Sequence, residues 1–376
     1  MNNHIIDRRN PQRWSLTNVL RQIHIDSLLL LGLLSLLGVG LMILYSAGDQ
    51  SSALMIRQLT RMAAAFAVLF VLANIHPDRM RDAAYFLYGI GLVLLIAVLA
   101  FGHEGKGAQR WLDLGFFRFQ PSELMKLAVP LLVASYLAER PLAPNILRLF
   151  VALAMIIVPS LLIAKQPDLG TSLLIASSGL IVIFLSGISW RIIIAFITTC
   201  TAALPVLWYV MHDYQRQRVL TFLNPESDPL GSGYHIIQSK IAIGSGGLFG
   251  RGWLEGTQSQ LAFLPERSTD FIFAVIAEEF GLVGVGILLF LYLLVAGRGL
   301  YIASQAQTSF ARLLAGSISL TFLVYVFVNV GMVTGLLPVV GVPLPLISYG
   351  GTSMVTLLAG FGILMSIHTH RRMMSP

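Results

Sequence analysis

Long apolar segments separated by shorter polar ones make up most of the sequence. The segments hold about 17 to 25 residues each, which is the length that an α-helix needs to cross the hydrocarbon core of a bilayer. They lie at 27–47, 54–74, 83–101, 122–138, 148–164, 169–187, 191–211, 271–297, 311–335 and 352–368. The pattern therefore predicts an all-α polytopic membrane protein with about ten transmembrane helices.

Two parts of the chain break this pattern. The segment 212–270, between the seventh and eighth predicted helices, is long and rich in glycine, and its apolar piece HIIQSKIAI could form an amphipathic helix on the bilayer surface. The segment 337–353, LPVVGVPLPLISYGGTS, contains three prolines and cannot be regular helix throughout. Irregular backbone at membrane depth is tolerated where it is buried in protein or lines a cavity. We therefore expect 337–353 to be a rigid or re-entrant loop, either purely structural or forming one wall of a site.

Composition and charge support the membrane assignment. The chain is 56% hydrophobic and 11% charged, whereas a soluble domain is about half apolar and a quarter charged. The net charge of +7 does not indicate nucleic-acid binding, because the basic residues are dispersed on short loops between membrane helices and act as an orientation signal. They predict a cytoplasmic N-terminal segment 1–26, a single membrane domain 27–368 with an extracytoplasmic loop 212–270, and a cytoplasmic tail 369–376. The single cysteine and the eight histidines form no pattern with metal-ligand spacing.

The strongest candidate for chemistry is Asp270, at the boundary between a polar stretch and the apolar run 271–297. A carboxylate at the mouth of a membrane helix is unfavourable unless it reacts, pairs or caps. One interpretation is a general base at the outer membrane surface, and the other is a helix N-cap. At 100° per residue, Glu278 lies about 80° around the helix from Asp270 and Glu279 about 180°. Only Glu278 is therefore expected to share a cavity with Asp270, while both glutamates have the alternative of pairing with an arginine such as Arg298.

A second group of charges lies on the fourth and sixth predicted helices. Glu123 and Lys126 are three residues apart and share one helix face, so they form either a structural ion pair or part of a polar cavity. Asp168 precedes the sixth helix and suits a cap or the same cavity. Among the basic residues of the predicted outer segments, Arg110, Arg216, Arg218 and Lys240 are candidates for holding an anionic group, with solvated surface charges as the alternative.

Several of these stretches together resemble the SEDS family (shape, elongation, division and sporulation), and in particular its elongation (RodA-type) branch. The resemblance covers the chain from the first membrane helix onwards. It is most specific in GAQRWLDLGFFRFQPSELMKLAVP at 107–130, QPDLGTS at 166–172, HDYQRQRVLTFLNPESDPLGSGYHIIQSKIAIGSGG at 212–247, LPERSTDFIFAVIAEEFG at 264–281 and GVPLPLISYGG at 341–351.

The resemblance implies a peptidoglycan glycosyltransferase that polymerises lipid II at the outer face of the bacterial cytoplasmic membrane. Asp270 matches the catalytic aspartate of the family, and Glu123, Lys126 and Asp168 match its polar-cavity residues. The implied partners are a class B penicillin-binding protein, which supplies transpeptidation, and the elongation-complex proteins MreC and MreD. We also expect a divalent cation, Mg²⁺ or Mn²⁺, to aid pyrophosphate binding, and no organic cofactor.

Two other functions suit the same pattern. Many membrane helices with internal acids and a proline-broken segment are typical of transporters, so a lipid II flippase is the main alternative. A non-catalytic scaffold for the elongation machinery is the other. The clustering of polar motifs on the predicted outer side, instead of at the membrane midplane, favours the glycosyltransferase.

Overall fold

The computed structural model describes residues 24–105, 108–113, 115, 118–139, 144–211, 213–224, 226, 232–260, 264 and 266–370. Within this part of the chain, a helix covers each of the ten predicted runs. These helices are α2 (Ser27–Ala47), α3 (Ser52–Ala73), α4 (Pro77–Phe101), α5 (Pro121–Ala138), α6 (Ile146–Lys165), α7 (Leu169–Leu185), α8 (Trp190–Val210), α12 (Ile272–Ser304), α13 (Ser309–Val333) and α14 (Thr352–Thr369).

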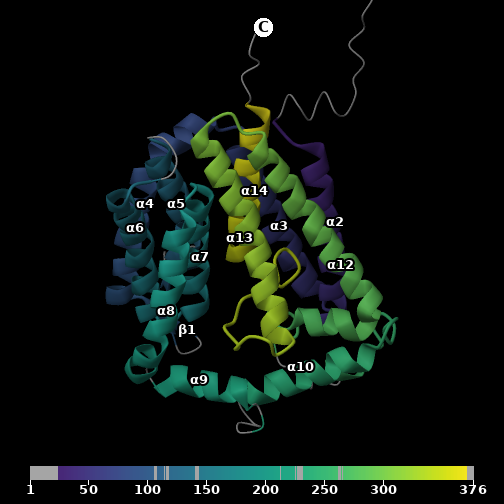
Figure 1. The fold of residues 1–376 in the computed structure, drawn as a ribbon. Helices are drawn as coiled ribbons and strands as arrows, with labels where there is room; N and C mark the ends of the chain where they lie inside the picture. Colours follow the sequence, from purple (N-terminus) through teal and green to yellow (C-terminus); the bar gives the residue numbers. More distant parts are fainter. Residues whose placement is uncertain are drawn as a thin grey trace, which may run out of the picture.

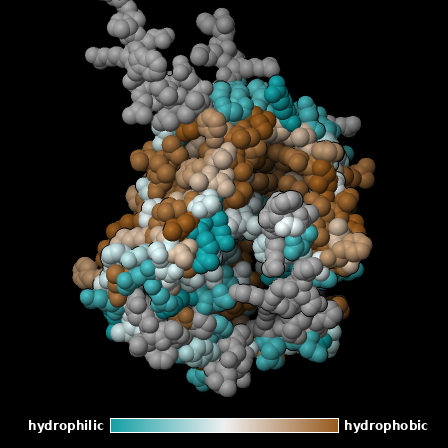
Figure 2. All heavy atoms as spheres, turned by 180° about the vertical axis from the view of Figure 1, so that it is seen from behind, coloured by the Kyte–Doolittle hydropathy of each residue, from teal (hydrophilic) through white to brown (hydrophobic). Residues whose placement is uncertain are grey.

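Seven of these helices, α2, α3, α4, α6, α12, α13 and α14, are long and apolar enough to cross a membrane. Helices α7 and α8 contain shorter apolar stretches, and α5 carries Glu123 and Lys126 in its first two turns. Figure 2 shows hydrophobic residues covering a broad band of one face, between hydrophilic residues at either end. The chain is therefore a polytopic all-α membrane protein.

Polar side chains fix where several helices begin. The side chains of Asp26, Asn145 and Asp168 accept hydrogen bonds from backbone N–H groups in the first turns of α2, α6 and α7, which otherwise lack partners. Pro77 and Pro121 occupy the first positions of α4 and α5, where the missing N–H has no cost. Asp168 thus acts as a cap, which was one of its two expected roles.

The long helices form one bundle with two distinct ends (Figure 1). Helix α2 begins and α14 ends at the same end, where the ring nitrogen Nδ1 of His24 lies 3.1 Å from the hydroxyl of Thr369; we call this the terminal end. Helices α9 (Asp213–Leu223) and α10 (Ser232–Gly246) lie across the opposite end, which we call the α10 end. Helix α13 packs against α5, α7, α12 and α14, so it runs through the core.

The connections at the α10 end contain structure that the apolar pattern did not predict. Between α4 and α5 lies a small antiparallel sheet of β1 (His103–Gly105), β2 (Ala108–Asp113) and β3 (Arg118–Phe119), in the order β1-β2-β3. Helix α10 confirms the helix expected from HIIQSKIAI, and the short helix α11 (Thr257–Gln260) follows it. The segment 337–351 contains no helix, as its prolines predicted.

Helix α12 differs from the regular helix that was expected at 271–297. It extends to Ser304 and is broken at Gly281, which has φ 65° and ψ −163°. The break frees backbone groups on both sides, and the loop after α10 pairs with them. The N–H groups of Leu282 and Val283 donate to Gly247 O and Leu248 O, and those of Arg251 and Gly252 donate to Glu278 O and Glu279 O.

The alternative in which Glu278 or Glu279 pairs with Arg298 is wrong. Arg298 donates to both carboxylate oxygens of Asp26, at 3.1 and 2.6 Å. These residues lie at the terminal end, because α12 runs on for several turns beyond Glu279 before it reaches Arg298. The described partners of the two glutamates lie elsewhere, as shown below, and Glu279 Oε2 is buried without a hydrogen-bond partner among the described residues.

Candidate active site

Asp270 lies at the α10 end, in the turn that precedes α12. Helix α12 has Phe271 as its N-cap residue, so Asp270 does not occupy the capping position itself. Its side chain is half-buried and faces the backbone of the proline segment, since a Cβ atom built on Gly341 would lie 3.5 Å from Asp270 Oδ2. Gly341 has φ of 70°, a conformation that glycine adopts readily and other residues avoid. The proline segment is thus one wall beside Asp270, as expected.

The backbone of the Asp270 turn is held by donors from one side. The carbonyls of residues 268, 269 and 270 accept hydrogen bonds from Tyr349 N–H at 2.8 Å, from the Ser348 hydroxyl at 2.5 Å and from the Asn329 side-chain amide at 2.9 Å. Two of these donors belong to the proline segment and the third to α13. The turn is therefore fixed relative to both elements.

Glu123 and Lys126 form the pair that their spacing predicted. Lys126 Nζ lies 2.8 Å from Glu123 Oε1, and the two side chains are 11% and 9% exposed. The ammonium group also lies 5.5 Å from the centre of the Tyr325 ring on α13, within the range of a cation–π interaction. Glu123 Oε2 is buried and has no hydrogen-bond partner among the described residues. Burying these two charged side chains costs free energy, and the described surroundings supply hydrogen bonds to only part of their polar atoms.

Asp168 and Arg110 form a second ion pair close to the first. Arg110 Nε lies 3.5 Å from Asp168 Oδ2, and the Arg110 guanidinium donates to Pro167 O at 2.8 Å. Gln120, the residue before α5, reaches the same Asp168 oxygen at 3.5 Å. Arg110 on β2 and Asp168 before α7, both predicted as site residues, are thus brought together.

The proline segment joins this cluster to Asp270. A Cβ atom on Gly170, in the first turn of α7, would lie 2.5 Å from Val340 O, so α7 and the proline segment approach closely beside Asp168. The next residue of the segment, Gly341, is the one that faces Asp270. Asp168 and Asp270 therefore flank the same short piece of backbone.

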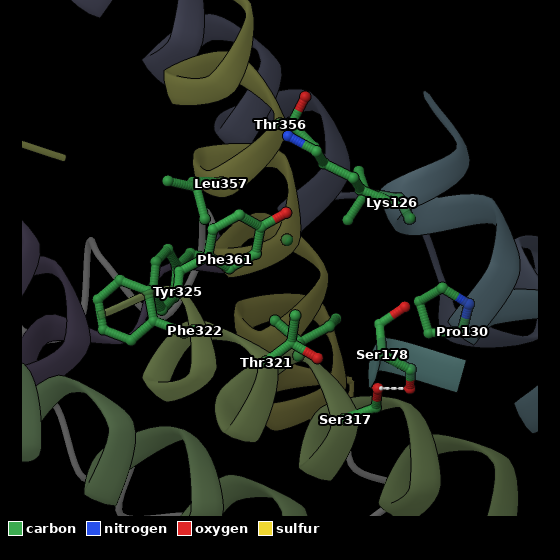
Figure 3. Close-up of a pocket in the computed structure, with 13 residues that line it drawn as sticks. Lys126, Pro130, Ser178, Ser317, Thr321, Phe322, Tyr325, Thr356, Leu357 and Phe361 are labelled. Atoms are coloured by element: carbon green, nitrogen blue, oxygen red, sulfur yellow. Dashed lines mark hydrogen bonds between the residues drawn. The ribbon is translucent and has the colours of Figure 1, made fainter. Parts of the chain in front are cut away.

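A cavity extends into the bundle below Lys126. It is lined by residues of α5, α7, α13 and α14. Figure 3 shows Lys126 near Thr356 at one end, and the hydrogen bond from Ser317 to Ser178 O, of 2.8 Å, at the other. The Thr321 hydroxyl lines the cavity and has no protein partner among the described residues. Lys126 thus lies between an acidic partner and a hollow of mixed apolar and hydroxyl character.

The remaining predicted cations do not join this cluster. Arg216 on α9 donates to Trp208 O at 2.9 Å and Tyr209 O at 2.7 Å, both in the last turn of α8. Lys240 is exposed on α10, with its Nζ beside Gly335 at the end of α13. The Arg218 side chain lies outside the described part of the structure.

Glu278 and Glu279 are buried and hold the loop that enters the break in α12. Glu278 Oε1 accepts hydrogen bonds from Gln258 N–H at 2.7 Å and from the Thr257 hydroxyl at 3.2 Å. Glu279 accepts a hydrogen bond from the hydroxyl of Ser46 on α2. The described contacts of Glu278 thus tie α12 to the start of α11.

His235 on α10 provides a neutral aromatic neighbour for the Asp270 turn. Its ring stacks on Phe271, with ring centres 5.6 Å apart. Burial lowers the pKa of His235, although the negative charge of Glu266 opposes this shift. The ring is therefore uncharged near neutral pH and adds no positive charge beside Asp270.

Two residues of this site were missed by the sequence analysis. Asn329 and Tyr325 lie one turn apart on α13, and they contact the Asp270 turn and Lys126 respectively. The sequence did contain a signal for Asn329, because a side-chain amide in an apolar run is unfavourable in the membrane interior unless it is hydrogen-bonded or functional.

The described residues do not form a ready-made metal centre. No group of three or more histidine, cysteine, aspartate or glutamate side chains comes together in this part of the chain. Mg²⁺ is often held by one or two carboxylates together with substrate phosphates, so the expected cation stays a prediction that depends on a bound phosphate.

These features describe a multi-pass helical membrane protein that has, at one end of its bundle, the Asp270 carboxylate, a nearly buried ion pair and a second, partly exposed ion pair. Similarity to known proteins identifies the family of this chain. Residues 19–373 match the family model FtsW/RodA/SpoVE, described as "Cell cycle protein". The chain therefore belongs to this family.

Relatives and solved structures agree with that assignment. The chain is 58% identical to "Peptidoglycan glycosyltransferase MrdB" of Escherichia coli strain K12, over 94% of this chain and 96% of the relative. It is 33% identical to "Peptidoglycan glycosyltransferase RodA" of Treponema pallidum, over 92% and 98%. A chain of the structure "Structural coordination of polymerization and crosslinking by a peptidoglycan synthase complex" matches with a TM-score of 0.80 and 36% identity, over 91% and 97%. The Thermus thermophilus rod shape determining protein RodA matches with a TM-score of 0.70 and 31% identity, over 91% and 96%.

Proposed function

We propose that this protein is the elongation peptidoglycan glycosyltransferase of its organism and that it polymerises lipid II with Asp270 as the general base. The observation that carries the proposal is the position of Asp270, half-buried beside the proline segment at the α10 end. The names of the relatives at 58% and 33% identity support the activity.

The reaction requires few protein groups. The 4-hydroxyl of the acceptor sugar loses a proton as it attacks the anomeric carbon of the donor, and a carboxylate within hydrogen-bond reach accepts that proton. The bond that breaks joins the anomeric carbon to polyprenyl pyrophosphate, which leaves with the electron pair. An α-linked donor and a β-linked product imply inversion in one displacement, without a covalent sugar–enzyme intermediate.

The leaving pyrophosphate needs positive charge nearby. Arg110 and Lys126 supply guanidinium and ammonium groups on the same side of the bundle as Asp270, and such preorganised charge stabilises a developing anion. Each cation already has an acidic partner, so the net positive charge is small. A divalent cation, Mg²⁺ or Mn²⁺, would supplement it, and loss of polymerisation on thorough chelation would support that requirement.

Orientation and partners follow from the same proposal. The protein lies in the bacterial inner membrane with both termini in the cytoplasm, which puts the α10 end outside, where lipid II is polymerised. The arginines near the predicted cytoplasmic helix ends support this direction. A class B penicillin-binding protein is the proposed partner, supported by the match to a chain of a peptidoglycan synthase complex. MreC and MreD are proposed as further members of the assembly.

The test is polymerisation of lipid II by the purified protein with its partner. Asp270→Asn keeps the side-chain shape but cannot accept the proton, so glycan chains should disappear while the variant unfolds at the wild-type temperature and still binds its partner. Normal chains from a folded Asp270→Asn protein would refute the assigned role. Translocation of lipid II in proteoliposomes without polymerisation would instead favour the flippase.

A further inference from the structure

Asn329 is a polar side chain about one turn before the end of the apolar helix α13. Its residue is fully buried, and its Nδ2 donates to Asp270 O at 2.9 Å and to Val342 O at 2.7 Å. Both partners are carbonyls that can only accept, so the amide nitrogen must face them and the orientation of the side chain is determined. A buried amide without partners is costly. The Asn329 Nδ2 donates to both loops, whereas its Oδ1 is buried without a partner among the described residues.

The two loops held by Asn329 are the ones that face each other across Asp270. One is the turn that carries the aspartate, and the other is the proline segment, whose Gly341 lies against the aspartate's carboxylate. Neither segment belongs to a helix, so neither has its position fixed by helical hydrogen bonding. Asn329 therefore acts together with Ser348 and Tyr349, which bond the two segments directly, to set the separation between Asp270 and its wall.

The same face of α13 also contacts the lysine of the second cluster. Tyr325 precedes Asn329 by four residues and therefore projects from the same face of the helix. Its ring lies 5.5 Å from Lys126 Nζ. Helix α13 thus contacts both the proposed general base and a cation that would face the leaving group.

We infer that Asn329 is a positioning residue for the glycosyl transfer: its amide clamps the Asp270 turn to the proline segment and so holds the carboxylate at the acceptor hydroxyl. The inference rests on the proposed function. Asn329 touches no reacting atom and acts only through the backbone of residue 270. Ser348 assists, because its hydroxyl donates to Thr269 O and accepts from Leu344 N–H.

The test compares Asn329→Leu, which has a similar shape and no donors, with the wild type. Misplacement of a catalytic group by about 1 Å can lower a rate by about 100-fold. We therefore expect kcat for lipid II polymerisation to fall by about 10- to 100-fold, while KM for lipid II stays within about twofold, because substrate contacts are not removed. Asn329→Gln, which keeps the two donors, should recover part of kcat.

Two further variants separate positioning from a general loss of packing. Ser366→Ala is the matched control, because Ser366 is also fully buried and donates across the bundle, to Ile75 O, but at the terminal end. It should lower the unfolding temperature without changing kcat of the folded protein. Ser348→Ala removes the neighbouring clamp contact and should lower kcat with KM unchanged, and it serves as the test if Asn329→Leu does not fold.

These measurements distinguish a failure of the positioning role from a failure of the proposed function. Wild-type kcat in folded Asn329→Leu and Ser348→Ala proteins would overturn the inference, as would a rise in KM that accounts for the whole loss of activity. Asp270→Asn is measured alongside. If that variant is active, the proposed function fails; if it is inactive while the Asn329 and Ser348 variants are normal, the positioning role alone fails.

Discussion

At the scale of single residues, the Glu123–Lys126 pair shows how a buried charge constrains its neighbours. The two charges are 2.8 Å apart and nearly excluded from solvent. Taking both out of water is costly, and their mutual attraction offsets that cost only while both are present. The pair is therefore sensitive to loss of one member and tolerant of loss of both.

Lys126→Met leaves Glu123 as a buried carboxylate without its cation. We expect the free energy of unfolding to fall by about 3–5 kcal/mol, measured by thermal or denaturant unfolding in detergent. The double variant Glu123→Gln, Lys126→Met should regain most of that stability because no uncompensated charge remains. If Lys126 also faces the leaving group, the double variant will stay inactive in polymerisation. Restored activity would show that the pair is structural only.

At the scale of elements, the break in α12 depends on Gly281 and on the loop that fills it. Gly281 has φ of 65°, and a Cβ atom there would lie 2.3 Å from Gly250 N and 2.6 Å from Leu248 O. The loop supplies hydrogen bonds to the backbone groups that the break exposes. The broken helix α12 and the loop after α10 are thus stable together, because each supplies hydrogen-bond partners for the backbone polar groups of the other.

Gly281→Ala should separate the loop from the helix. A left-handed conformation costs a non-glycine residue about 1–3 kcal/mol, and the clash with backbone atoms adds to this, so the unfolding temperature should drop clearly. Gly286→Ala, five residues along the same helix, is the matched control, since a Cβ atom there has no neighbour within 4 Å. It should be neutral or stabilising by up to about 1 kcal/mol. Equal effects of the two substitutions would contradict this account of the break.

At the scale of the whole molecule, Asp26 ties together three helices at the terminal end. It caps α2 through Leu29 N–H at 2.8 Å and accepts from Arg298 of α12 at 2.6 Å, and its Oδ2 lies 3.0 Å from His368 Nδ1 of α14. Burial by itself raises the pKa of Asp26, but the hydrogen bonds from His368 and Arg298 outweigh it and hold this pKa well below its usual range. The ionised carboxylate therefore stabilises the folded bundle.

The pH dependence of this contribution has a definite sign. Because the folded-state pKa is lowered, the stabilisation is fully present above the ordinary carboxyl pKa of 3.8 and is lost as the pH falls towards the lowered value. Asp26→Asn should therefore destabilise the protein clearly at about pH 6 and much less at about pH 3, in unfolding experiments in detergent. Asp78→Asn, at an exposed position in the first turn of α4, should show no such difference. An Asp26→Asn effect that is constant with pH would contradict the assignment.

The positions of the helices and most of the chemistry-bearing residues can be read from the amino-acid sequence alone. Apolar runs of membrane-spanning length leave the backbone no alternative to helix in lipid, which is why a helix covers every predicted run. Charged residues in and beside such runs are few, so Asp270, Glu123, Lys126 and Asp168 stand out by residue type and position alone. Proline alone excluded a regular helix at 337–353.

Which of these groups contact one another depends on the packing of the helices. Arg298 lies on the same helix as Glu278 and Glu279 but contacts Asp26, which is distant in sequence. Gly281 breaks α12 because a loop from outside the helix supplies the missing hydrogen bonds. Asn329 becomes informative only when Asp270 O and Val342 O are both found beside it. The periodicity and composition of a segment indicate whether it lies in lipid or in water. Ion pairs and hydrogen bonds between distant segments depend instead on how the helices pack, which no single segment specifies.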